Sequence, residues 1–164
     1  MATQIHWPER YDPACTPVHV RNEIISRATP EAIWMWLARA SAWPSWYPNS
    51  ANVCIEKGSS NDLFLGSRFT WRTFGVSIRS SVREFVLNER IAWSALGIGV
   101  DAYHAWVIET VPEGTRILTE ETQHGWAARL NAIVFPNRMH RFHQIWLERL
   151  SHVAQAGPLL NISA

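Results

Sequence analysis

The residues best suited to acid–base chemistry share one face of a predicted strand. Residues 115–123, TRILTEETQ, alternate with a period of two, so every second side chain points the same way: Ile117, Thr119, Glu121 and Gln123. If Ile117 points into the protein, Glu121 does too, and an apolar environment raises the pKa of a carboxyl group. Such a carboxyl group could act as a general acid or base. The opposite register, with Leu118 inward, would instead leave Glu121 in solvent.

Histidines could complete an acid–base pair with this carboxyl group. His104 has the same strand parity as Trp106, and His124 lies at the junction between the last strand and the final helix. Imidazole changes its charge near neutral pH, so either ring could move protons if it lay beside Glu121. Glu121, His104 and His124 are therefore the candidate catalytic residues. The alternative is that the histidines are surface groups or have only structural hydrogen bonds.

The sequence predicts no metal site and no cofactor. His140 and His143 are three residues apart in a helical segment, but no third ligand is indicated, and HExxH motifs and cysteine clusters are absent. Cys15 and Cys54 fit no metal spacing, and we expect free thiols in a reducing cytoplasm rather than a disulfide. The sequence also contains no nucleotide-binding glycine loop and no G-x-S-x-G nucleophile motif.

Aromatic residues are unusually frequent, with 10 tryptophans among 164 residues. Tryptophan combines a large apolar area with a polar N–H group and is enriched at binding surfaces. Nine residues are candidates for contact with a bound molecule: Trp46, Phe69, Trp71, Ile78, Trp93, Trp106, Gln123, Trp126 and Phe142. The alternative is that these rings only fill the core.

The periodicity of the chain predicts the elements that must position these residues. Residues 18–26 alternate as a strand, and Thr29 and Pro30 mark the start of a short helix as its N-cap and first residue. Six further segments have the pattern of strands: 52–57, 67–74, 76–85, 90–95, 102–111 and 115–123. Their connections are mainly short turns, such as residues 59–62, which favour antiparallel pairing.

From residue 127 to 155 the apolar pattern becomes helical, with one kink or break expected at Pro136. Its apolar stripe should cover the sheet: Leu130, Ile133, Val134, Phe142, Ile145, Trp146, Leu150 and Val153. The predicted fold is therefore α+β, with a curved antiparallel sheet of about seven strands wrapped around a long C-terminal helix and two short helices after the first strand. A gap between sheet and helix is a usual place for a small-molecule site.

The segment SAWPSWYPNS contains two prolines that limit any helix to about one turn. We expect Trp46 to face the cavity and Trp43 to lie between the short helices and the sheet. Tyr47 should sit at the rim with its hydroxyl group in water. On this interpretation the segment is a wall of the cavity.

Length and composition restrict the class of protein. The length indicates one domain, residues 18–156, after an irregular arm, residues 1–17, and before a tail, residues 157–164. The formal net charge of +1 gives no electrostatic argument for nucleic acid or for an anionic membrane. No apolar run is long enough to span a membrane and no signal peptide is visible, so we expect a cytoplasmic protein.

Several motifs resemble the START-like superfamily, also called Bet v 1-like or SRPBCC, and within it the polyketide cyclase/dehydrase-type bacterial members. ATPEAIW (28–34) resembles the opening of the family's first helix, and WPSW (43–46) followed by Pro48 resembles its WP-W-P segment. GSRFTW (66–71), HAW (104–106), GTR (114–116) and EETQHG (120–125) resemble its strands and the start of its final helix. The match covers residues 18 to 155 and implies a helix-grip fold.

The resemblance implies a small hydrophobic ligand, aromatic or of polyketide or lipid type, in a cavity between the sheet and the C-terminal helix. The alternative is a cofactor-independent cyclase or aromatase that uses Glu121 and a histidine as acid and base. A third hypothesis is a partner-binding domain with an exposed aromatic patch from Trp7, Tyr11 and residues 43–47. The oligomeric state is expected to be monomer or homodimer.

Overall fold

A curved seven-stranded antiparallel sheet forms the body of the protein in the computed structural model, which describes residues 4–56 and 62–157. The strands are β1 (Val18–Ser26), β2 (Ala51–Glu56), β3 (Arg68–Thr73), β4 (Val76–Val86), β5 (Arg90–Gly97), β6 (Val100–Val111) and β7 (Gly114–His124). Their order in the sheet is β1-β7-β6-β5-β4-β3-β2, so all neighbours except β1 and β7 are consecutive in the chain. The predicted α+β fold with about seven strands is confirmed.

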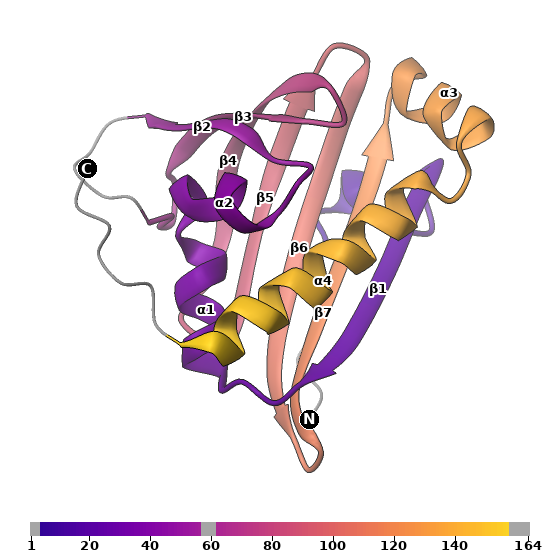
Figure 1. The fold of residues 1–164 in the computed structure, drawn as a ribbon. Coiled ribbons are helices and arrows are strands. Elements are labelled where there is room, and N and C mark those ends of the chain that lie inside the picture. The colour runs from indigo at the N-terminus through magenta and orange to yellow at the C-terminus, as the bar shows by residue number, and fades with distance from the viewer. Residues whose placement is uncertain (1–3, 57–61, 158–164) are drawn as a thin grey trace.

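The helices are α1 (Pro30–Ala38), α2 (Trp43–Trp46), α3 (Trp126–Val134) and α4 (Arg138–Ala156), with short 3-10 turns η1 (Glu9–Tyr11) and η2 (Ala40–Ala42). Helix α4 crosses the concave face of the sheet, and α3 stands at the end opposite to α1 (Figure 1). Helix α1 packs on α4, and Trp43 of α2 contacts Trp146 near the middle of α4. Along the described residues, no helix is long and apolar enough to cross a membrane.

Local sequence signals explain where the helices begin and end. The Thr29 hydroxyl group accepts a hydrogen bond from the Ala32 amide at 3.3 Å, and Pro30 occupies the first helical position of α1. The predicted interruption at Pro136 is confirmed, because α3 ends at Val134 and α4 begins at Arg138. The predicted turn at residues 59–62 lies outside the described residues except for Asp62, and the tail lies outside them after Gly157.

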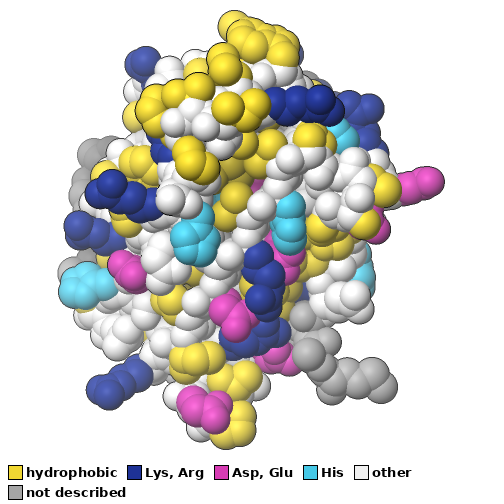
Figure 2. Space-filling view, turned by 90° about the vertical axis from the view of Figure 1, so that its right-hand side faces the viewer, with side chains coloured by type: hydrophobic (Ala, Val, Ile, Leu, Met, Phe, Trp, Pro, Cys, Tyr) yellow, Lys and Arg dark blue, Asp and Glu magenta, His cyan; other side chains and the backbone are white. Residues whose placement is uncertain are grey.

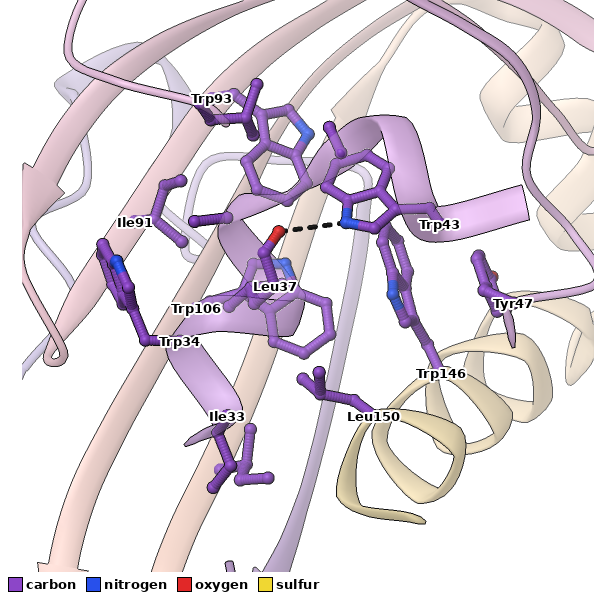
Figure 3. Close-up of a cluster of buried hydrophobic side chains, with 14 of the residues drawn as sticks. Ile33, Trp34, Leu37, Trp43, Tyr47, Ile91, Trp93, Trp106, Trp146 and Leu150 are labelled. Atoms are coloured by element: carbon purple, nitrogen blue, oxygen red, sulfur yellow. Dashed lines mark hydrogen bonds between the residues drawn. The ribbon is translucent and has the colours of Figure 1, made fainter. Parts of the chain in front are cut away.

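Aromatic side chains fill the half of the concave face that α1 and α2 cover (Figure 3). Trp43 lies at their centre, 5.3–5.8 Å from the rings of four neighbours: Phe69, Trp71, Trp93 and Trp146. Its indole N–H donates to the Leu37 carbonyl at 3.0 Å. Trp43 therefore joins the short helices to the sheet, and its polar group is satisfied within the core.

The segment before β1 packs on the convex face of the sheet. Tyr11 stacks on Tyr103 at 5.3 Å, and its hydroxyl group donates to Asp101 at 2.6 Å. Trp7 also packs against Tyr103, so neither ring forms a free patch. Cys15 and Cys54 are exposed free thiols. The division into arm, domain and tail stays a prediction.

Two expectations about apolar residues are wrong. Leu130, Ile133 and Val134 do not cover the sheet. The helix breaks at Pro136, and α3, the part before the break, presents these three side chains to solvent. Tyr47 is 1% exposed rather than at the rim, because it stacks on Trp146 at 4.3 Å. Its hydroxyl group accepts from the Asn49 amide at 3.2 Å, and burial raises its pKa.

Candidate functional site

A cavity of about 230 Å³ lies between the sheet and helices α3 and α4, at the end away from α1. Small side chains on strands and helix make room for it: Ala95, Ala102, Ala127 and Ala128. Polar side chains also line it, among them Thr73, His104, Glu121, Gln123, Asn131, Arg138 and His143. The volume is below the roughly 300–1,000 Å³ of typical ligand pockets, so the space fits a molecule of one or two rings.

Strand pairing places His104 directly opposite Glu121. The two residues are Cα partners in the β6–β7 register, and directly opposed residues of antiparallel strands point to the same face. Here that face is the concave one, so the inward parity of residues 117, 119, 121 and 123 is correct. His104 Nδ1 lies 3.2 Å from Glu121 Oε2.

Helix α4 adds a second histidine to this carboxylate. His143 Nε2 lies 3.1 Å from the same Glu121 Oε2, and the Gln123 amide donates to Glu121 Oε1 at 2.6 Å. His104 Nε2 lies 2.7 Å from the hydroxyl group of Thr119, which fixes the ring from its other side. We call His104, Glu121 and His143 the His–Glu–His cluster.

The electrostatics of Glu121 differ from the sequence expectation. Burial by itself raises the pKa of this carboxyl group, but His104 and the hydrogen bonds from His143 and Gln123 outweigh burial and lower it to about 2. The expected raised pKa is therefore wrong, because the sequence does not show how many donors converge on the carboxylate. Glu121 is an anion at neutral pH.

His104 is neutral at neutral pH. Its complete burial lowers its pKa to about 3, against the opposite effect of Glu121. Neutral imidazole carries one N–H, and an ionised Glu121 can only accept, so the proton belongs on Nδ1 and Nε2 accepts from Thr119. The side chain of Glu121 is 12% exposed and those of both histidines are 2% exposed, so the carboxylate is the most accessible member of the cluster.

The cluster also has the composition of a metal site. His104, Glu121 and His143 each offer one ligand atom, and these atoms lie within 4.8 Å of one another. This convergence was not visible in the sequence, where His143 was paired with its helix neighbour His140. In the structure His140 lies outside the cluster, with its carbonyl group accepting from Asn22 at 3.2 Å.

Some of the candidate residues line the cavity and others do not. The lining includes the candidates His104, Glu121, Trp71, Ile78, Trp93 and Gln123. Phe69 and Trp106 are instead buried in the aromatic core, and Trp46 lies beside Tyr47 in α2. Phe142 packs edge-on against Phe74 at 5.3 Å, behind the lining. The proposed contact of these four residues, Phe69, Trp106, Trp46 and Phe142, with a ligand stays a prediction.

Two further candidates lie away from the cluster. His124 Nε2 lies 2.7 Å from the Arg10 carbonyl, and its ring packs against Tyr11, so it contacts the N-terminal arm and not Glu121. His124 follows Glu121 by three residues in the same strand, and an odd separation already indicates that the two side chains point to opposite faces of the sheet. Trp126 begins α3 and is 67% exposed.

Many lining residues were not among the sequence candidates, and four of them are Tyr47, Arg138, His143 and Trp146. The guanidinium group of Arg138 lies 5.2 Å from the centre of the Phe74 ring and 5.5 Å from that of the Phe135 ring. For His143 a signal existed. It precedes Trp146 and Leu150 at spacings of three and seven, which places it on their buried helix face.

The family model described as polyketide cyclase / dehydrase and lipid transport matches residues 17–155. The chain therefore belongs to this family, as the sequence motifs suggested. No curated protein sequence matches it.

Solved structures show the same fold. A hypothetical protein from Helicobacter pylori, jhp0584, is 32% identical with a TM-score of 0.88, and the match covers 94% of this chain and 98% of that one. Zhui aromatase/cyclase from Streptomyces sp. R1128 is 18% identical with a TM-score of 0.65 over 87% of this chain and 99% of that one. The di-domain aromatase/cyclase StfQ is 13% identical with a TM-score of 0.70, over 85% of this chain and 51% of that one.

Proposed function

We propose that the protein binds a small aromatic molecule that carries a hydroxyl group. The observation that carries this proposal is an ionised carboxylate, Glu121, facing a cavity whose other walls are largely apolar and aromatic. A buried anion favours a partner that can donate a hydrogen bond. A phenolic or enolic hydroxyl group meets this need and brings an apolar ring for Trp71 and Trp93.

The same geometry disfavours an acidic group at the inner end of the ligand. A ligand carboxylate beside Glu121 would place two like charges in surroundings of low dielectric constant. The ligand should therefore be neutral where it meets Glu121. The polyketide and lipid ligands suggested by the family name are too large to be enclosed in about 230 Å³, so only one end of such a molecule would enter.

Matched ligands test the proposal. Isothermal titration calorimetry should show that 2-naphthol binds at least about tenfold more tightly than 2-methoxynaphthalene, because only the naphthol donates to Glu121. 2-Naphthoic acid should bind more weakly than either. In Glu121→Gln the preference for naphthol over its methyl ether should shrink. Equal affinities for the naphthol and its ether in the wild-type protein would contradict the proposal.

A second candidate is a cofactor-independent cyclase-type enzyme. The observation that favours it is the contact of Glu121 Oε2 with both His104 Nδ1 and His143 Nε2 at 3.1–3.2 Å. In this scheme Glu121 takes a proton from an enolisable position, and a histidine N–H that had donated to the carboxylate is then free to polarise the neighbouring carbonyl. Binding ranks first because a base works best when its pKa lies near the operating pH, and that of Glu121 is about 2.

Turnover of a linear polyketone, followed by mass spectrometry of the products, tests this candidate. We expect Glu121→Gln to abolish cyclisation while the protein keeps its fold. A chelator is the control, because acid–base catalysis without a cofactor should not respond to it. Unchanged product formation in Glu121→Gln would exclude this role for the carboxylate.

A further inference from the structure

Helix α3 presents its apolar side to solvent. Five residues of this helix and its C-terminal end are more than half exposed: Trp126, Leu130, Ile133, Val134 and Phe135. Trp126, Leu130 and Ile133 are spaced by four and three, so they form one stripe along the helix. In a surface helix such a stripe usually faces the core, but the inward side of α3 carries Ala128 and Asn131.

Two hairpin turns add apolar side chains at the same end of the molecule. Val76 follows the β3–β4 turn, and Leu96 and Ile98 flank or occupy the β5–β6 turn, with Ile98 85% exposed. Figure 1 places both turns and α3 at one end, and Figure 2 shows hydrophobic side chains gathered at the top of the face that it views. We call these eight residues the apolar end.

Most charges around the apolar end are positive, and the acidic Asp101, which is the strand partner of Leu96, is paired with Arg10. The segments that build it, residues 71–80, 94–100 and 125–147, contain no aspartate or glutamate and five arginines: Arg72, Arg79, Arg129, Arg138 and Arg141. Among the described residues, none of the five takes part in an ion pair. The balanced net charge of the whole chain therefore conceals a local excess of positive charge.

The apolar end surrounds the mouth of the cavity. Val76 and Ile98 belong to both the exposed patch and the cavity lining, and Ala127, Ala128 and Asn131 line the cavity from α3. The amides of Ala127 and Ala128 donate to the Gly99 carbonyl at 3.0 and 3.4 Å, which ties the start of α3 to the β5–β6 turn. A surface that contacts the apolar end also meets the mouth.

We propose that α3 and the two hairpin turns dock on an anionic phospholipid bilayer, with the cavity mouth toward the lipid. A protruding helix with tryptophan and aliphatic residues on one side and arginines around it fits a membrane interface, where apolar side chains enter the acyl boundary and cations meet lipid phosphates. The protein would lie on the bilayer without crossing it. The inference goes beyond the proposed function and holds whichever molecule the cavity takes.

Vesicle flotation tests the docking. The protein should float with phosphatidylcholine vesicles that contain phosphatidylglycerol and much less with phosphatidylcholine alone, and salt should weaken the binding. Brominated phospholipids should quench part of the tryptophan emission, and Trp126→Phe should remove that part. Absence of flotation with anionic vesicles would overturn the proposal.

Paired variants locate the contact. Ile133→Glu should reduce vesicle binding at least tenfold, whereas Leu87→Glu should not, because Leu87 is similarly apolar and 64% exposed but lies on the β4–β5 turn at the other end. Arg129→Glu should weaken binding several-fold more than Arg149→Glu, which changes the far half of α4. Thermal unfolding must show that each variant folds. The proposal is overturned if Ile133→Glu and Leu87→Glu bind vesicles equally well. It is also overturned if light scattering shows a dimer that Ile133→Glu disrupts and Leu87→Glu does not.

Discussion

The two halves of the concave face differ in how their side chains are packed. Beside α1 and α2, tryptophans pack ring against ring, and Trp43, Trp93, Trp106 and Trp146 are buried almost completely. Beside α3, alanines replace rings at the sheet surface, and the His–Glu–His cluster stands at the boundary between the two halves. Trp93 and Trp146 belong to both, with His104 5.0 Å from the first and 5.3 Å from the second.

This difference shows what the abundant tryptophans do. Most of them make one half rigid and closed, so that a small volume can stay open in the other half without collapse of the sheet onto α4. The rigid half also supplies the wall against which His104 is held. The aromatic residues therefore support the candidate site mainly by packing behind it.

Among the substitutions that test this contrast, Trp43→Ala should have the largest effect. We expect the free energy of unfolding to fall by about 3–5 kcal/mol, because the substitution removes a ring at the centre of the packed half and leaves a cavity. Urea denaturation followed by circular dichroism measures the change. A loss below about 1 kcal/mol would show that this half is not closely packed.

The pH dependence of stability tests the cluster at the boundary. The folded-state pKa of His104 is about 3 against 6.5, and that of Glu121 is about 2 against 4.5, so the unfolded chain binds more protons in acid. The stability that each group contributes is complete above its unfolded pKa. It is lost as the pH falls, between about 6.5 and 3 for His104 and between about 4.5 and 2 for Glu121.

The free energy of unfolding, measured by urea denaturation between pH 7 and 4.5, should therefore fall with a slope of up to ~1.4 kcal/mol per pH unit for one proton. His104→Gln should flatten this slope, whatever its effect on stability at pH 7, because glutamine does not titrate. The exposed His152→Gln is the control and should keep the slope. The same slope in His104→Gln as in the wild-type protein would contradict the assignment of a buried neutral His104.

A smaller effect is expected from filling the open half. Ala95→Leu adds an isopropyl group from β5 into the cavity and should lower the affinity for 2-naphthol by at least about tenfold, which is ~1.4 kcal/mol. Ala156→Leu makes the same change at an exposed position near the end of α4 and should leave the affinity unchanged. Calorimetry on both variants measures the difference. Undiminished affinity in Ala95→Leu would place the ligand elsewhere.

The smallest effect on stability is expected for Trp126→Ala. The residue type is the same as at position 43, but Trp126 is largely exposed, so the free energy of unfolding should change by less than about 0.5 kcal/mol. Vesicle binding should nevertheless weaken, since the ring belongs to the apolar end. Differential scanning calorimetry beside vesicle flotation separates the two effects, and a change in stability as large as that of Trp43→Ala would refute the contrast.

Much of the fold could be predicted because it depends on local patterns. Alternation gave the strands, Thr29 and Pro30 gave the start of α1, and Pro136 gave the break before α4. The inward direction of Glu121 followed from the same alternation once Ile117 was taken as core. These features need no knowledge of which distant segments meet.

The candidate site was harder to predict because it depends on contacts between distant segments. His104 meets Glu121 through the β6–β7 register, and His143 reaches them only through the path of α4 across the sheet. The number of donors on Glu121 then reversed the expected shift of its pKa. The outward apolar side of α3 was missed for a related reason, since helical spacing alone does not say which neighbour, if any, covers a stripe.

The central claim is that the His–Glu–His cluster forms the polar end of a ligand site. Nuclear magnetic resonance of histidine side chains during titration with 2-naphthol tests it most directly. We predict that the imidazole signals of His104 and His143 shift and saturate together, while those of the exposed His6 and His152 stay unchanged. Saturable binding that leaves the signals of His104 and His143 unmoved would contradict the claim.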